Sequence, residues 1–111
     1  MSREIKEADW KLLRQMAPVA LERFCQRTLG EIDRISTDTT KSQHQRYLDI
    51  FAALQRRDEE IGHAFNGLRR STALTQLAAM CSHDLLTEEE FSRFSPETRS
   101  VIELFLSHRR A

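Results

Sequence analysis

The sequence predicts an all-α protein, a compact bundle of about five helices built on a long antiparallel helical hairpin. The chain of 111 residues has only three glycines and two prolines, so few residues interrupt a helix. Consecutive β-branched residues occur only at Thr39-Thr40 and Val101-Ile102, and no segment is typical of a strand. In the middle of the chain, apolar residues alternate at spacings of four and three, as in an amphipathic helix. This seam consists of Tyr47, Phe51, Leu54, Ile61, Phe65 and Leu68.

Two helices are predicted in the first third of the chain. The first covers about residues 6–16. Pro18 disfavours helical geometry at Ala17 and suits the first turn of a new helix, so a break is expected there. The second helix then covers about residues 18–35, with an apolar stripe that includes Phe24 and Ile32.

A cluster of turn residues at 36–40 separates the second helix from the third. Asp38 or Thr40 is expected to cap the third helix, and Thr40 with Gln43 fits a capping box. Because this connection is short, the two helices should be antiparallel neighbours. The third helix is predicted over about residues 41–65 and carries the apolar seam, with Asp58 in one of its positions.

The remaining elements follow from stop and start signals. Asn66-Gly67 tolerates the left-handed conformation found at helix ends, and the apolar pattern changes phase after it. A break is therefore expected there, followed by a fourth helix over about residues 71–82. Thr87 begins a capping box with Glu90 ahead of a short helix, and Pro96 begins the last helix, predicted over about 96–107. Residues 1–111 are predicted to form one domain.

The composition disfavours some classes of function and indicates the cellular compartment. The 17 basic and 17 acidic side chains give no net charge, whereas a protein that holds a polyanion usually has a basic excess. No apolar run approaches the ~20 residues that span a bilayer, and the first residues lack the apolar core of a signal peptide. We therefore predict a cytoplasmic protein without a membrane segment, in which Cys25 and Cys81 are reduced and packed as small apolar residues.

The catalytic and metal signals are incomplete. Glu60 and His63 have the Glu-x-x-His spacing of di-iron bundles, but no second copy of the motif exists. Cys81 and His83 have no matching pair at zinc-site spacing. The chain has no glycine-rich phosphate loop and no Gly-x-Ser-x-Gly elbow. We predict no metal, no cofactor and no enzymatic activity.

Asp58 and the arginine pairs are the polar candidates. An acid on an apolar seam either lies in solvent, pairs with an arginine of another helix, or serves as a catalytic carboxylate. Three arginine pairs occur, at 56–57, 69–70 and 109–110. Arg69, Arg70 and Ser71 lie at the predicted helix break, where arginines and a helix N-terminus can bind an anion or nucleic acid.

Three stretches carry a resemblance to a known family. They are Ala20-Leu21-Glu22-Arg23-Phe24-Cys25, the segment 65–74 (FNGLRRSTAL) and the segment 85–91 (LLTEEEF). They resemble a family of small bacterial all-helical proteins of uncharacterised activity, and the resemblance extends over most of the chain. It implies a bacterial cytosolic setting and no mechanism.

The sequence favours an interaction module that is not an enzyme and that binds itself, as a dimer, or another protein. Two features motivate this interpretation. The long third helix would extend beyond its short neighbours, and Phe91, Phe94 and Phe105 are aromatic anchors of the kind found at interfaces. Asp58 is the third candidate interface residue. The alternative is a regulatory protein that binds nucleic acid or an anion through its arginine pairs. Sequence alone leaves the partner and the pathway open.

Overall fold

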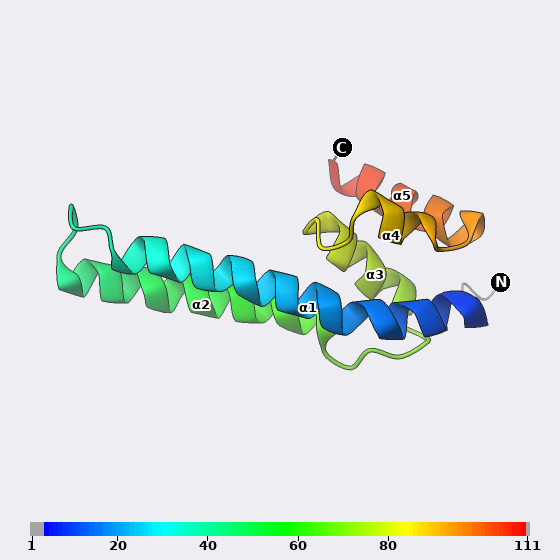
Figure 1. Cartoon of the computed structure of the whole chain (residues 1–111), viewed down its shortest axis with the longest axis horizontal. Helices are drawn as coiled ribbons and strands as arrows, with labels where there is room; N and C mark the ends of the chain where they lie inside the picture. Colours follow the sequence, from blue (N-terminus) through cyan, green and yellow to red (C-terminus); the bar gives the residue numbers. More distant parts are fainter. Residues whose placement is uncertain (1–3, 111) are drawn as a thin grey trace.

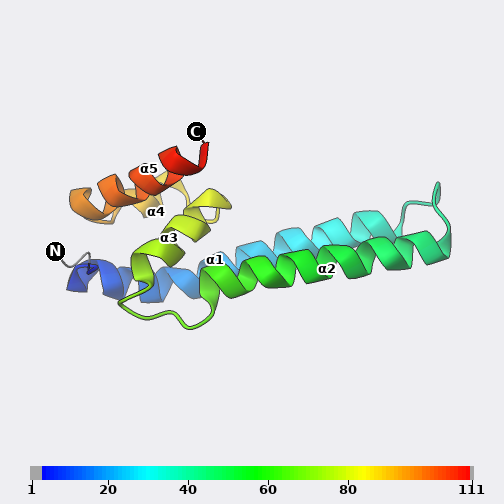
Figure 2. The same cartoon turned by 180° about the vertical axis from the view of Figure 1, so that it is seen from behind.

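The computed structural model describes residues 4–110, with the side chains through His108. This part of the chain forms five helices and no strand: α1 (Glu7–Ser36), α2 (Gln43–Phe65), α3 (Ala73–Ser82), α4 (Glu88–Ser92) and α5 (Pro96–Arg110). The predicted all-α class and the long antiparallel hairpin, formed by α1 and α2, are confirmed (Figure 1). The molecule measures 54 × 28 × 25 Å and is compact at one end only. There α3, α4 and α5 cover the hairpin, whose other half projects alone (Figure 2).

The first two predicted helices are one continuous helix, so the break expected at Pro18 is wrong. Pro18 lies inside α1. Leu13, Ala17 and Ala20 are buried before and after it, so packing against the rest of the protein holds both halves of α1 in line. Pro18 and Arg14 are both exposed, and water can therefore reach the Arg14 carbonyl that proline leaves without its helical donor.

Both ends of α2 follow local signals, although the N-cap is neither of the two residues expected, Asp38 and Thr40. Ser42 is the N-cap, and its side chain accepts a hydrogen bond from the Gln45 amide. Asp38 instead closes the loop by accepting bonds from the amide and hydroxyl of Thr40. The predicted break after Phe65 is confirmed, because Gly67 adopts a φ of 63°, in the left-handed region that glycine enters without strain.

The face of α2 that packs on α1 is not the apolar seam. Ala53 and Ala64 are buried on this face, where their small side chains let the two helices approach closely. Between them, Arg57 donates to the Glu31 carboxylate (Nε–Oε1, 2.9 Å). The apolar seam is therefore covered by the rest of the protein only in its second half. Ile61, Phe65 and Leu68 are partly buried against the core, whereas the residues nearer the hairpin loop are exposed.

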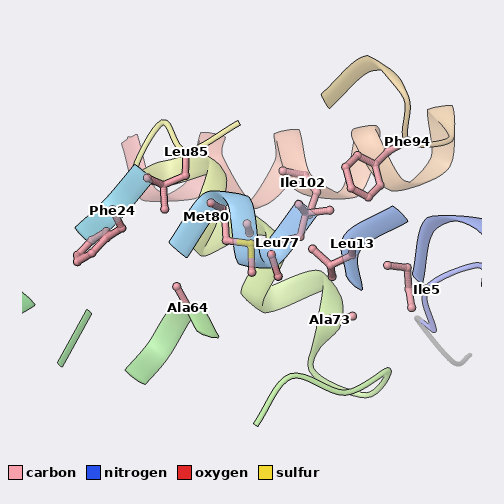
Figure 3. Packing of buried hydrophobic residues seen from close by; sticks show 13 residues of the cluster. Ile5, Leu13, Phe24, Ala64, Ala73, Leu77, Met80, Leu85, Phe94 and Ile102 are labelled. Carbon is pink, nitrogen blue, oxygen red and sulfur yellow. The ribbon is translucent and has the colours of Figure 1, made fainter. Parts of the chain in front are cut away.

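The hydrophobic core lies at the compact end and is centred on α3. Leu77 and Met80 of α3 are fully buried, and Figure 3 shows them between the side chains of α1 and Ile102 of α5. Phe94 is 2% exposed and belongs to this core, with Phe91 packed beside it at a ring-centroid distance of 6.4 Å. Phe94 is therefore a core residue and not the exposed interface anchor that was expected.

Two acidic residues tie the C-terminal helices to α1. Asp9 is buried and accepts hydrogen bonds from Ser95 and Thr98, which begin α5. Both terminal nitrogens of Arg23 donate a hydrogen bond to the Glu90 carboxylate (2.7 and 2.9 Å). The hydrogen bonds from Arg23 lower the pKa of Glu90 to about 2. Glu90 also completes the predicted capping box with Thr87, which is confirmed.

Candidate functional site

The projecting half of α2 carries a patch of large apolar side chains in solvent. Its four members, which we call the apolar patch, are Tyr47, Leu48, Phe51 and Leu54, exposed by 66%, 43%, 54% and 46% respectively. Tyr47, Phe51 and Leu54 belong to the predicted apolar seam, whereas Leu48 does not. Scattered exposed leucines are ordinary on a protein surface, but four large apolar residues within two helical turns form a contiguous site.

The apolar patch has few charged neighbours on α2. None of the exposed residues of α2 as far as Gln55 is an acid, a lysine or an arginine: Gln43, His44, Gln45, Tyr47, Leu48, Phe51, Ala52, Leu54 and Gln55. The two charged residues of this stretch make bonds within the chain. Arg46 donates to the Ser36 carbonyl (2.7 Å), and Asp49 accepts from Lys41 (3.1 Å). Since 31% of the chain is charged, an uncharged exposed surface of this length stands out.

The apolar patch points away from the rest of the molecule. With about 100° of rotation per residue, Ala53 and Arg57, which face α1, lie on the other side of α2 from Phe51. The helix α3 also lies on that other side. Its residues Thr75 and Ala78 line a cavity together with Glu60 and His63, which lie about 180° and 120° from Phe51 around α2. The patch is therefore open to a partner along its length.

A second candidate is a cavity of about 600 Å³ between α2, α3 and α5. Three histidines, His63, His83 and His108, line it together with Glu60 and Phe105. Glu60 accepts a bond from Arg57 (2.7 Å), and its other oxygen lies 4.0 Å from His83 Nε2. Within the described residues, no three histidine, cysteine or carboxylate side chains are grouped so that they could hold a metal ion. Sequence reasoning missed this cavity because its histidines come from three separate segments.

The predicted anion site is open to solvent. Arg69, Arg70 and Ser71 are all exposed, in the turn before α3. Arg70 forms an ion pair with Glu7 (2.7 Å), and both side chains are more than half exposed. Part of the main chain of this turn is bonded locally, because the Arg69 amide donates to the hydroxyl of Thr72.

The other arginine pairs differ in what surrounds them. Arg57 is held between Glu31 and Glu60, and Arg56 lies 3.8 Å from Glu31. The side chains of the pair at 109–110 lie outside the described residues. Asp58, the remaining candidate, is exposed on the projecting hairpin, as in the solvent interpretation of its place on the seam.

Cys25 and Cys81 are free thiols, and both are half-buried. Burial, followed by the nearby Asp84 carboxylate, raises the pKa of the Cys81 thiol to about 11. A thiol with this pKa holds only about 0.1% thiolate at pH 8 and is a poor nucleophile.

We therefore expect slow alkylation of Cys81. In a Cys25→Ser variant, iodoacetamide should react more than about a hundredfold more slowly at pH 8 than with a free cysteine peptide. The rate should rise about tenfold per pH unit up to pH 10, because the thiolate fraction does so. Mass spectrometry of timed samples measures the alkylation rate at pH 8 and its change with pH. A rate that levels off below pH 9 would contradict the raised pKa.

Comparison of the chain with family models, curated proteins and solved structures finds no match. The resemblance to a bacterial helical family therefore stays a prediction. Within the described residues, no helix has the length and apolar character needed to cross a membrane.

Proposed function

We propose that this protein is an interaction module without enzymatic activity, which binds a protein partner through the apolar patch of α2. The observation that carries the proposal is the apolar patch, on a hairpin that projects from the globular end. Between Gln43 and Gln55 the exposed residues of α2 include no acid, lysine or arginine. The cores of protein interfaces are depleted of charged residues and enriched in aromatic ones, and Tyr47 and Phe51 supply two aromatic anchors.

The position of charged residues supports the same conclusion. Exposed charges resume directly after the uncharged surface, at Arg56, Asp58 and Glu59. An apolar centre with a charged border is the usual arrangement of an interface. We also propose a cytoplasmic location, which the two free thiols support, because cytosolic proteins keep their cysteines reduced.

The nucleic-acid or anion-binding alternative has weaker support. Arg57 and Arg70 both form ion pairs with acidic residues of α1, and binding an anion there would compete with those pairs. No surface feature of comparable size to the apolar patch accompanies Arg69 and Arg70 in the described part of the chain.

Site-specific photocrosslinking tests the proposed function. Benzoylphenylalanine at position 54 should form covalent protein adducts in a lysate of the cells that make the protein. The same group at position 104 serves as the matched control, because Leu104 is 59% exposed but lies on α5. We expect few adducts from position 104.

Competition makes the test specific to the apolar patch. Excess unlabelled wild-type protein should change the adducts at position 54. It should displace adducts with a different protein, or be crosslinked itself where the partner is a copy of the chain, whereas excess Phe51→Asp protein should leave the adducts as they are. Equal adducts at positions 54 and 104, or an equal effect of the two added proteins, would overturn the proposal.

A further inference from the structure

The exposed face of α2 is symmetric about Phe51. Within seven positions of Phe51 along α2, six further residues lie within about 60° of it around the helix, three before it and three after it. They stand three, four and seven positions away on each side, and all are exposed: His44, Tyr47, Leu48, Leu54, Gln55 and Asp58. We call Phe51 and these six residues the Phe51-centred face.

The chemistry of the two halves is complementary. Three positions away on either side lie Leu48 and Leu54, which are both apolar. At four positions lie the Tyr47 hydroxyl, a donor, and Gln55, whose amide oxygen accepts.

At seven positions lie His44 and Asp58, an imidazole and a carboxylate that can form a hydrogen bond or an ion pair. Each group on one half therefore has a suitable partner on the other.

An antiparallel pair of α2 helices brings these halves together. If a two-fold axis passes through Phe51, each residue before Phe51 faces the residue the same distance after it in the other copy. A two-fold interface places one surface against itself, so a charge near the axis would meet its own sign. Here Asp58, the only acid on the face, meets His44, and the two Asp58 residues lie about 21 Å apart along the helix.

We propose that the partner of the apolar patch is a second copy of this chain, bound antiparallel through the Phe51-centred face. This inference rests on the proposed function and names its partner. The charge balance is compatible with it, because a chain without net charge does not repel its own copy at long range. Since α1 and α3 contact α2 from the other side, the two hairpins can form a four-helix arrangement with the globular ends at opposite ends.

The first experiment measures the mass in solution. Sedimentation equilibrium or light scattering should give a dimer for the wild-type protein. Phe51→Asp should raise the dimer dissociation constant by about thirtyfold or more, because it places two carboxylates at the axis. Leu104→Asp, the control, should leave the dissociation constant unchanged. Circular dichroism should show that Phe51→Asp remains folded, since Phe51 is already half exposed in one copy.

The second experiment tests the orientation by disulfide formation in a Cys25→Ala/Cys81→Ala background. Phe51→Cys should form a disulfide-linked dimer, because both copies place this residue at the axis. His44→Cys alone and Asp58→Cys alone should not, since their equivalent positions lie about 21 Å apart along the helix. A mixture of these two variants should form the linked heterodimer. Self-linking of His44→Cys would indicate parallel pairing and overturn the inference.

The outcomes separate this inference from the proposed function. A monomeric protein that still forms specific photoadducts with a different protein at position 54 would overturn the self-association and leave the interaction function standing. A monomeric protein without such adducts would overturn both.

Discussion

Replacing Asp9 by alanine is expected to lower the free energy of unfolding by about 2–4 kcal/mol. Asp9 is 3% exposed and accepts three hydrogen bonds, from the Ser95 amide (3.0 Å), the Ser95 hydroxyl (2.6 Å) and the Thr98 hydroxyl (2.6 Å). Alanine leaves these donors partly buried without their acceptor. It also removes the connection between the first turns of α1 and of α5. Urea unfolding followed by circular dichroism measures the change.

The control for Asp9 is another aspartate of the same helix. Asp33 is exposed in α1, and Asp33→Ala should change the free energy of unfolding by no more than about 0.5 kcal/mol. A loss of similar size in both variants would show that the buried carboxylate has no special role.

The contribution of Asp9 should also depend on pH. Burial acts to raise its pKa, but the hydrogen bonds from Ser95 and Thr98 outweigh burial, and the pKa lies below the ordinary value of 3.8. A carboxylate with a lowered pKa in the folded state stabilises the fold above its unfolded pKa of about 3.9. This stabilisation is lost as the pH falls through the folded pKa. The stability difference between wild type and Asp9→Asn should therefore be constant near neutral pH and shrink below about pH 4.

Leu77→Ala should lower the free energy of unfolding by about 2.7–5 kcal/mol. Leu77 is fully buried in α3, and its removal leaves a cavity among side chains from α1 and α5 (Figure 3). Leu104→Ala makes the same chemical change at a residue that is 59% exposed, and should cost about 0.5 kcal/mol or less. Thermal and urea unfolding of the two variants provide the comparison. Similar losses would contradict a core centred on α3.

Local signals predicted much of the fold. The capping box at Thr87, the stop at Gly67 and the start at Pro96 each depend on residues within one helical turn, and the structure has all three. The hairpin followed from a short polar connection between two long amphipathic segments. The apolar seam also contained three of the four residues of the apolar patch.

Long-range packing accounts for what sequence reasoning missed. Pro18 interrupts the hydrogen bonding of an isolated helix, but buried residues on both sides keep α1 continuous. The seam has the greater hydrophobicity, yet the small side chain of Ala53 and the pairing of Arg57 with Glu31 decide which face of α2 meets α1. In the sequence, Asp9 cannot be told from an ordinary surface acid. Its hydrogen-bond partners lie 86 and 89 residues further along the chain, where no local pattern points to them.

The projecting hairpin has a thermodynamic consequence for its own residues. Its outer half consists of two helices with no third layer, so each helix there is supported by packing against one neighbouring helix only. Local opening must therefore require least free energy near the loop at residues 37–42 and most where α3 covers the base. A partner bound at Phe51 would raise the free energy of this local opening. Binding is therefore coupled to the ordering of the outer half of the hairpin.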